Sequence, residues 1–494
     1  MKKIVVTTAQ KSAPANKGLV KNLARFIKEE KATDVYIFVA KGKSVYEEVS
    51  EGRLEDREMH PTQKNGTWKQ FGEGRRRVYK VTRDVHPSIA KLQREGLAGA
   101  TVHLLYDTKR EGMQLNANLK LYHTQIAPQK SNPFYQVNKR LSDKYSYIVP
   151  GTKPFQDSIG GFNFKVRLFT STGALTMPSY RTDFSVGNVA NQEHTFGFVA
   201  VTIRSNRIFN ADLVISTKQG DFQLDEKVYK GGKLGTGSVE NYVCGDVHVD
   251  VSDKVAVKET KAHMQLLQPK IITFHDISDS KPINPHEDTN LFAKIARANP
   301  KNPDLEQSLH QVLAFIRDMC TSFPNSRIDI VESNHDEFLR RYIASQTYEQ
   351  DYRNYLFVVG LIPKFFTDKF RKPALELAME HISGGDLPSN LRFLNHTDLQ
   401  LTRGFVTSRH GHKGTNGAKG SPASFIREAI KMIVGHGHRY IFRPNFVMVG
   451  HLTDLKKQKY AHSGISNWLQ ANAYIDSFGI VHGKILNSNF NRKK

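Results

Sequence analysis

Six short motifs along this chain contain residues that could bind divalent cations. They hold Asp246 and His248, Asp276 and Asp279, Asn334 to Asp336, His410 and His412, His436 and His438, and His451. Carboxylates, imidazoles and one amide are ligands suited to two cations of the manganese or zinc type. Such cations activate water for hydrolysis. The motifs therefore predict a metal-dependent hydrolase.

Five of these motifs follow short apolar runs that are typical of buried strands. The runs are Tyr242-Val243, Ile271–Phe274, Ile328–Val331, Phe405-Val406 and Met432–Val434. The carboxyl ends of parallel strands meet at one edge of an α/β sheet, where such sheets bind their ligands. We therefore expect the five runs to bring the motifs together.

The motif order, Asp-x-His, a second Asp, Asn-His-Asp, His and then Gly-His-x-His, resembles the calcineurin-like metallophosphoesterase superfamily, which includes nucleases of the Mre/SbcD type. The resemblance covers Val243 to Leu486, about half of the chain. It implies a two-metal phosphoesterase with a β-sandwich flanked by helices. The implied ligands are Asp246, His248 and His438 for one metal, Asn334, His410 and His436 for the other, and Asp276 as a bridge between both.

The same resemblance makes His335 the catalytic histidine and Asp336 its orienting partner. Water held between two cations loses its proton near neutral pH and attacks phosphorus, and a histidine protonates the leaving alkoxide. The chain departs from the family pattern where His275 and Ser333 replace glycines, so the geometry of these two turns stays open. Two further carboxylates compete as ligands, Asp279 and Asp250, and we favour solvation or helix capping for them.

A narrower resemblance concerns phage metallophosphoesterases. The glycine-rich stretch His410–Ser421 is similar to a segment of those proteins, and so are Thr172–Tyr180 and the residues around His286. This resemblance implies an early protein of a tailed phage, a nuclease that degrades host DNA or a DNA-transfer protein.

Four residues are candidates for substrate contact. Lys413 and Lys419 lie between glycines that would let ammonium groups and backbone amides approach a phosphate, and a flexible loop with incidental lysines is the alternative. His286 and Arg443 could also reach the substrate, with a surface or packing role as the alternative. We interpret His451 as structural.

The patterning predicts an α/β (α+β) chain in three parts. Residues 1–158 form an α/β module, with strands at Ile4–Thr8 and Asp34–Val39, a helix at Lys17–Lys31 and a charged surface excursion from Lys41 to Lys80. Residues 159–240 form an antiparallel extension that contains Phe164–Phe169 and Phe196–Ile203. Residues 241–494 form the catalytic domain, with helices at Leu305–Phe323 and Lys372–Ile382.

Composition restricts the class of protein further. The 494 residues carry a net charge of +23, which favours nucleic acid as a partner. Only Cys244 and Cys320 are present, so a disulfide framework is excluded and a reducing compartment is expected. The longest apolar run, Tyr355–Phe366, is interrupted and too short to span a membrane. With no secretory leader, we expect a cytoplasmic protein, in the host cytoplasm if a phage encodes it.

The leading hypothesis is a DNase that uses two divalent metal ions, manganese ahead of zinc, iron or magnesium. A nucleotide phosphodiesterase or a phosphoprotein phosphatase is the alternative among enzymes. A DNA-binding or structural phage protein with a vestigial metal site is the alternative from another class. A homo-oligomer is compatible with the sequence.

Overall fold

The computed structural model describes residues 1–40, 85–106, 112–124, 126, 130, 132, 134, 141, 144–161, 165–369, 371–428, 430–458 and 464–489, together with three strands between residues 45 and 81. Its contacts divide this mixed α/β chain into two units. Unit 1 comprises Met1–Pro154, Thr170–Phe222 and Tyr229–Leu234. Unit 2 comprises Phe155–Phe169, Gln223–Val228 and Gly235–Lys494. The domain boundaries proposed from the sequence stay a prediction.

Unit 1 contains a five-stranded sheet with the order β13-β12-β1-β2-β6. The strands are β1 (Lys2–Gln10), β2 (Asp34–Ala40), β6 (Thr101–Leu105), β12 (Gly197–Ile203) and β13 (Phe209–Ile215). β1, β2 and β6 are parallel, whereas β12 runs antiparallel to β1. The two strands and the helix predicted between Ile4 and Val39 are confirmed. β12, which was predicted in the antiparallel extension, is part of this sheet.

Helix α1 (Lys17–Glu30) follows β1 in the chain. Asn16 begins it, since its side chain accepts a hydrogen bond from the backbone N–H of Leu19. Its apolar face is buried, and the ring of Phe26 lies 5.3 Å from that of Phe198 on β12. Packing of this face on the sheet is what stabilises the helix.

Further strands and helices lie outside both the five-stranded sheet and the core of unit 2. They are β3 (Val45–Glu48), β4 (Thr67–Phe71), β5 (Gly74–Val81), α2 (Pro87–Glu95), β7 (Met113–Asn116), β8 (Leu119–Leu121), β9 (Ser146–Val149), α3 (Ser185–Gln192), β14 (Phe222–Leu224), β15 (Lys227–Lys230) and β16 (Lys233–Thr236). β3, β4 and β5 fall in the predicted excursion Lys41–Lys80, whose side chains lie outside the described residues. Residues 490–494 lie outside the described residues as well.

Unit 2 is organised around a six-stranded sheet with the order β20-β19-β18-β17-β26-β27. The strands are β17 (Val239–Val243), β18 (Ile271–His275), β19 (Arg327–Val331), β20 (Leu391–Leu394), β26 (Ala471–Asp476) and β27 (Val481–Ile485). β17, β18, β19 and β20 are parallel neighbours, and β26 and β27 are antiparallel. The carboxyl ends of β17, β18 and β19 therefore lie side by side at one edge.

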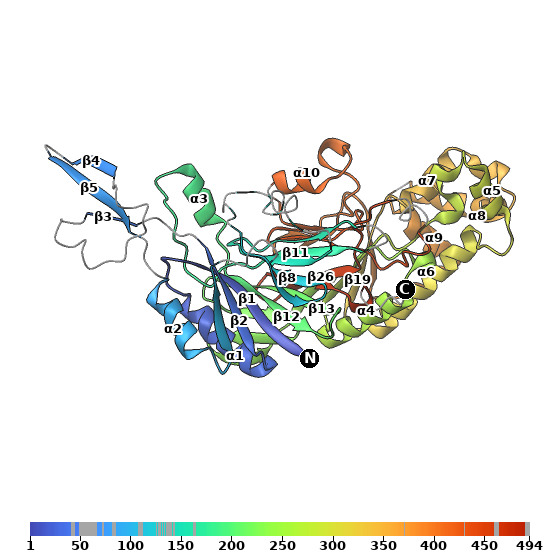
Figure 1. Cartoon of the computed structure of the whole chain (residues 1–494). Helices are drawn as coiled ribbons and strands as arrows, with labels where there is room; N and C mark the ends of the chain where they lie inside the picture. The colour runs from blue at the N-terminus through green and yellow to red at the C-terminus, as the bar shows by residue number, and fades with distance from the viewer. Residues whose placement is uncertain are drawn as a thin grey trace. The chain divides into compact units, whose positions relative to one another are not determined.

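Helices cover one face of this sheet (Figure 1). Those that contribute residues to its buried core are α4 (Lys254–Leu267), α6 (Leu305–Ser322), α7 (Asp336–Ala344), α8 (Tyr355–Asp368) and α9 (Ala374–Ile382). Helix α5 (Leu291–Ala298) buries none of its residues, and Phe425 of α10 (Pro422–Arg427) packs with Phe446 instead. Short 3-10 turns are η4 (Val249–Val251), η5 (Lys281–Ile283), η6 (Pro285–Glu287), η7 (Thr347–Gln350), η8 (Thr415–Gly417) and η10 (Asn487–Asn489). Met264 of α4 and Ile316 of α6 share one buried core with Ile272 and Ile328 of the sheet. The predicted helices Leu305–Phe323 and Lys372–Ile382 are confirmed as α6 and α9.

A second set of strands lies in the same unit. They are β10 (Gln156–Ile159), β11 (Arg167–Ser171), β21 (Leu401–Thr402), β22 (Phe405–Val406), β23 (Met432–Val434), β24 (Ile441–Arg443) and β25 (Phe446–Met448), in the order β21-β22-β23-β25-β24-β10-β11. Asn241 on β17 donates to the hydroxyls of Thr402 and Thr407 in this second set, at 3.3 and 3.2 Å. The six-stranded sheet thus has helices on one face and strands on the other, as expected for a sandwich flanked by helices.

No helix among the described residues is long and apolar enough to cross a membrane.

Candidate metal centre

The carboxyl ends of the parallel strands deliver the predicted ligands. Asp246 follows β17, Asp276 follows β18 and Asn334 follows β19, so three neighbouring strands supply one ligand each. His410 follows β22, and His436 follows β23. The expectation that the apolar runs bring these motifs together is therefore correct.

Several of these residues have unusual backbone conformations. His248, Asp276, His436 and His438 have φ angles of 43°, 46°, 69° and 52°, in the left-handed region that side chains other than glycine rarely adopt. Strain of this kind costs on the order of 1–3 kcal/mol per residue and gathers at functional sites. Four strained residues among the predicted ligands indicate a functional site.

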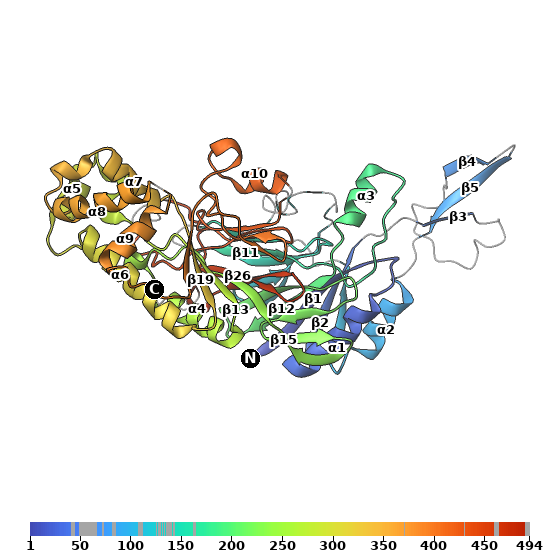
Figure 2. The same cartoon turned by 180° about the vertical axis from the view of Figure 1, so that it is seen from behind.

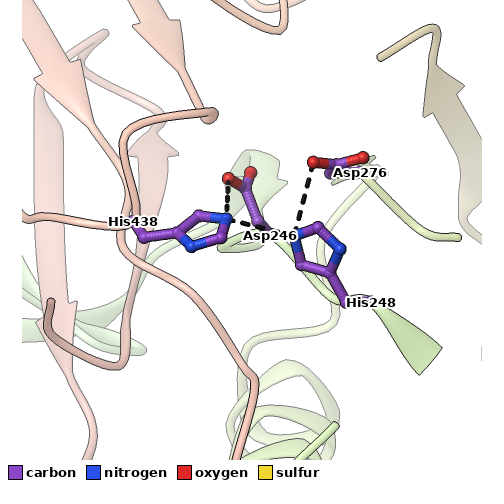
Figure 3. A group of neighbouring side chains, drawn as sticks. All are labelled: Asp246, His248, Asp276 and His438. Carbon is purple, nitrogen blue, oxygen red and sulfur yellow. Dashed lines mark hydrogen bonds and ion pairs between the residues drawn. The ribbon is translucent and has the colours of Figure 1, made fainter. Parts of the chain in front are cut away.

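The first cluster consists of Asp246, His248, Asp276 and His438, all of them buried (Figure 3). His438 Nε2 lies 3.2 Å from Asp246 Oδ2, and His248 Nε2 lies 3.3 Å from Asp276 Oδ2. The two histidine Nε2 atoms are only 3.0 Å apart. One ligand atom from each of the four residues can thus meet around a single point.

Unsatisfied polar atoms show that the residues of this cluster fit a bound cation. Both carboxylate oxygens of Asp246 and Oδ1 of Asp276 are buried without a hydrogen-bond partner. Leaving such atoms unpaired is costly, so buried carboxylates are normally paired or coordinate a metal. Two carboxylates that face two imidazoles are a donor set that a divalent cation would complete.

The electrostatics of the cluster follow from burial and from its opposed charges. Burial, and after it the charge of Asp276, raises the pKa of Asp246. Burial also opposes ionisation of Asp276, but the imidazoles of His335, His248 and His410 offset it and hold the pKa of Asp276 far below its usual range. Burial lowers the pKa of His438 to about 3, which keeps this ring neutral and able to act as a ligand.

A second cluster adjoins the first. Asn334 Oδ1 lies 3.0 Å from His410 Nε2 and 3.1 Å from His436 Nδ1. His410 Nε2 also lies 3.5 Å from Asp276 Oδ2, so one oxygen of Asp276 is close to both clusters. Burial lowers the pKa of both His410 and His436, which favours the neutral, ligating form of each ring.

His335 lies beside the first cluster. Its ring centroid is 4.9 Å from that of His248, and the ring stacks on Phe338 at the same centroid distance with an interplanar angle of 24°. His335 Nδ1 lies 2.9 Å from the backbone carbonyl oxygen of Asp279, which can accept a hydrogen bond from it. The carbonyl and Phe338 thus orient the imidazole.

Asp336 does not have the role expected of it. Its Oδ2 accepts the backbone N–H of Ser333 at 2.8 Å, and its own N–H donates to the Ser333 hydroxyl at 3.2 Å. These reciprocal bonds close the turn that begins α7, as in a capping box. Burial, and after it the charge of Asp276, raises the pKa of Asp336 well above its usual range. The described contacts give Asp336 a structural role in this turn and no bond to His335.

Asp279 is the residue that the sequence interpretation undervalued. Its Oδ1 lies 3.2 Å from His248 Nδ1, and its carbonyl holds His335. A carboxylate on the far nitrogen of a ligating histidine fixes the ring orientation and strengthens the ligand. Its position three residues after Asp276 is the sequence signal for a role at the site, whereas the sequence interpretation favours solvation or helix capping. Asp250, the other competing carboxylate, accepts a hydrogen bond from Ser308.

The residues predicted to contact substrate differ in their exposure and in their contacts. Lys413 forms an ion pair with Glu337, which His412 Nε2 also approaches at 3.4 Å, and Lys419 is exposed opposite Lys413 in the same glycine-rich loop. His286 is exposed, and its ring lies against Phe338. The contacts of Lys413 and His286 are thus with Glu337 and Phe338, which follow Asp336 in α7. Lys419 lies in the same loop as Lys413.

Arg443 has a packing role, the alternative raised for it from the sequence. Its guanidinium donates to Asp157 Oδ2 at 2.9 Å and lies 4.2 Å from the ring centroid of Phe155. Because this pair satisfies the charge of a side chain that is only 11% exposed, Arg443 holds β24 to the chain around β10. His451 Nδ1 accepts the backbone N–H of Thr453, and its ring centroid lies 5.8 Å from that of His438, so a structural role for His451 stays a prediction.

Comparison with known proteins yields one distant relative that bears on the chain. The chain is similar to Protein A1 of Escherichia phage T5, with 26% identity over 292 residues. The match covers 55% of this chain and 51% of the phage protein, so the chain spans about half the length of that relative. No family model matches the chain. No solved structure matches it either.

Proposed function

We propose that this protein is a two-metal phosphodiester hydrolase of the calcineurin-like metallophosphoesterase type, and that its substrate is DNA. The observation that carries the proposal is the position of Asp276. One of its carboxylate oxygens lies 3.3 Å from His248 of the first cluster and 3.5 Å from His410 of the second. A carboxylate between two imidazole-rich ligand sets is the arrangement expected for a bridge between two cations.

The proposed holders of the metals are the predicted ligands. Asp246, His248 and His438 would hold one cation, Asn334, His410 and His436 the other, and Asp276 both. Bound divalent cations would supply positive charge for the phosphoryl oxygens and lower the pKa of water. Nitrogen and oxygen ligands in nearly equal number suit manganese or zinc, with iron and magnesium as competitors.

The proposed role of His335 is to protonate the leaving oxygen. Because Nδ1 can donate to the Asp279 carbonyl at 2.9 Å, Nε2 is the nitrogen left to exchange a proton with the substrate. Stacking on Phe338 limits rotation of the ring. His335 thus has the orientation of a general acid whose proton sits on Nε2.

Two observations support DNA over a small phosphoester. The chain has a net charge of +23, and residues 1–154 alone contain 29 lysines and arginines against 15 aspartates and glutamates. An excess of this size attracts polyanions without regard to sequence. The similarity to a phage protein supports a role during infection, and we propose host DNA in the host cytoplasm as the target.

The test uses Asp276→Asn, which keeps the shape of the side chain and removes its charge. Plasmid DNA, bis(p-nitrophenyl) phosphate and a phosphoserine peptide are each incubated with Mn²⁺, Zn²⁺, Mg²⁺ or EDTA. We expect Mn²⁺-dependent cleavage of DNA by the wild type, and at least a 100-fold loss in Asp276→Asn with less metal at both sites by elemental analysis. Asp318→Asn, an exposed carboxylate on α6, is the matched control and should behave as the wild type.

Each other outcome has a definite meaning. Turnover of Asp276→Asn at the wild-type rate would remove the two-metal mechanism. Hydrolysis of the small diester or of the phosphopeptide, with DNA left intact, would assign the alternative enzyme classes. Bound metal without hydrolysis of any substrate would favour a structural phage protein.

A further inference from the structure

A network of hydrogen bonds between buried side chains reaches the loop that contains Asp246. Asn472 of β26 accepts the backbone N–H of Gly245 at 2.9 Å, and Gly245 directly precedes Asp246. The amide of Asn472 donates to the hydroxyl of Tyr242 at 3.1 Å and to that of Thr260 on α4 at 2.9 Å. These three side chains are buried where α4 covers the sheet that contains β19 and β26 (Figure 2).

The network continues from Tyr242 to a charged pair. Tyr242 Oη lies 3.0 Å from Nδ1 of His263, and Nε2 of His263 lies 2.8 Å from Oδ1 of Asp225, in the turn between β14 and β15. Lys484 of β27 donates to both carboxylate oxygens of Asp225 at 3.2 Å. The backbone N–H of Asp225 donates to Tyr474 Oη at 2.9 Å, which also fixes this turn. The network comprises Asn472, Thr260, Tyr242, His263 and Asp225.

The direction of the bonds in this network follows from the bond at Gly245. A backbone N–H can only donate, so the oxygen of the Asn472 amide faces Gly245 and its NH₂ group faces Tyr242. The Tyr242 hydroxyl accepts that bond and has His263 Nδ1 as the acceptor for its own proton. His263 is then neutral and donates through Nε2 to Asp225. Hydrogen bonds that run in one direction polarise and strengthen one another.

The electrostatic surroundings favour the neutral form of His263. Burial, and after it the charge of Lys484, lowers the pKa of His263, although the carboxylate of Asp225 opposes this shift. Burial raises the pKa of Tyr242 well above its usual range, so its hydroxyl keeps its proton. The protonation states that the bond directions require are therefore those that the surroundings stabilise.

The orientation of Asp246 depends on its backbone. Both of its carboxylate oxygens are buried without a hydrogen-bond partner. A Cβ at Gly245 would lie 2.8 Å from the carbonyl oxygen of Ala471 and 2.9 Å from the carbonyl carbon of Gly450, so the loop passes through a space that fits glycine. Without the Asn472 acceptor, the N–H of Gly245 would gain another partner only if its peptide turned, and Asp246 would turn with it.

We propose that Asn472 and Tyr242 are positioning residues for the first cluster, which hold the loop of Asp246 in the conformation that binds a cation. The inference rests on the proposed function, because Asp246 is there a ligand of the first metal. His263 and Asp225 fix the Tyr242 hydroxyl from the other side. Partners behind metal ligands contribute about 10- to 100-fold to metal affinity.

The test measures Mn²⁺ affinity of the full chain in two backgrounds. Asn334→Ala leaves the first cluster as the intact site, and Asp246→Asn leaves the second. Tyr242→Phe keeps the ring and removes the hydroxyl. It should weaken Mn²⁺ binding by about 10-fold in the Asn334→Ala background and by less than about twofold in the Asp246→Asn background. Isothermal titration calorimetry of the metal-free protein gives both values.

Two further variants separate positioning from stability. Tyr342→Phe is the matched control, since it removes a buried hydroxyl of α7 that donates to Asp351 at 2.7 Å, and it should leave Mn²⁺ affinity unchanged in both backgrounds. Thr260→Val removes the other acceptor of the Asn472 amide and should weaken the first site selectively, also if Tyr242→Phe does not fold. Thermal unfolding reports whether each variant is folded.

The pattern across the two backgrounds decides the outcome. Equal weakening in both would overturn the proposal, because a network that only stabilises the fold affects both sites alike. Unchanged affinity in the Asn334→Ala background would overturn it too and would leave the proposed function standing. Selective weakening, together with a wild type that hydrolyses no phosphoester, would support the positioning role and remove the proposed function.

Discussion

At the scale of single residues, Asp279 is the most instructive position. It connects a predicted metal ligand with the predicted catalytic histidine, through its carboxylate on His248 and its carbonyl on His335. One residue can therefore set the orientation of two imidazoles. The Asp279 carboxylate lies 3.2 Å from His248 Nδ1 and 3.8 Å from His335 Nδ1, so substitution of this side chain should act mainly on His248.

The first prediction separates proton transfer from metal binding. His335→Asn should keep both metals and lose about 100- to 10,000-fold in turnover of DNA, since general acid catalysis contributes in that range. The loss should be smaller for a nitrophenyl ester, because its stable leaving group needs no proton. Turnover on both substrates and metal content by elemental analysis check this. Loss of one metal equivalent would show that His335 is a ligand instead.

Asp279→Asn is the matched variant for this experiment. The substitution keeps the carbonyl that holds His335 and removes the charge on the far side of His248. We expect metal affinity to fall by about 10- to 100-fold, as for other partners of ligating histidines, with the same relative activity on the two substrates as in the wild type. A loss of turnover on DNA but not on the nitrophenyl ester, with metal affinity unchanged, would show that Asp279 acts through His335 and not through His248.

At the scale of elements, the strand-to-loop turns decide whether the ligands converge. Gly435 follows β23 and precedes His436, and a Cβ at this position would lie 2.1 Å from Asp246 Oδ1 and 3.0 Å from the Cβ of His275. The turn can therefore approach the β17 and β18 loops only with glycine at this point. His275, which stands where the family pattern has glycine, is fully buried beside it.

The second prediction follows from this approach. Gly435→Ala should displace the Asp246 carboxylate, lower metal content at the first cluster and destabilise the fold by about 1–3 kcal/mol, the usual cost of overpacking. Elemental analysis and urea denaturation measure the two effects. Gly235→Ala is the matched control, because a Cβ there meets nothing within 4 Å. Full metal content in Gly435→Ala would show that the turn can shift without cost.

At the scale of the whole molecule, the net charge of +23 should govern the encounter with DNA. The third prediction is that DNA binding measured in EDTA weakens steeply with salt, because phosphate contacts release condensed counterions. If six to ten phosphates are contacted, affinity should fall by about 10³- to 10⁵-fold between 50 and 200 mM salt. Fluorescence anisotropy of a labelled duplex checks this. A flat dependence would favour the small-phosphoester alternative.

The sequence by itself determined the sheet edge and its ligands. Apolar runs before Asp246, Asp276 and Asn334 predicted buried parallel strands, and parallel strands place their carboxyl ends together whatever the loops do. The amphipathic pattern of Leu305–Phe323 likewise predicted α6, because one apolar stripe suffices to specify a helix that packs on a core.

Only the tertiary structure decided which partner each polar side chain meets. Asp336 binds Ser333 in its own turn, and Asp279 lies beside His335. Backbone conformations such as the φ of 46° at Asp276 set the direction of these loops. Arg443 pairs with Asp157, 286 residues earlier in the chain, which local patterns cannot reveal. The sequence also showed that Tyr355–Phe366 is apolar, but which of its residues are buried depends on where the core of unit 2 lies. Such contacts join residues far apart in sequence, so their geometry exists only once the chain has folded.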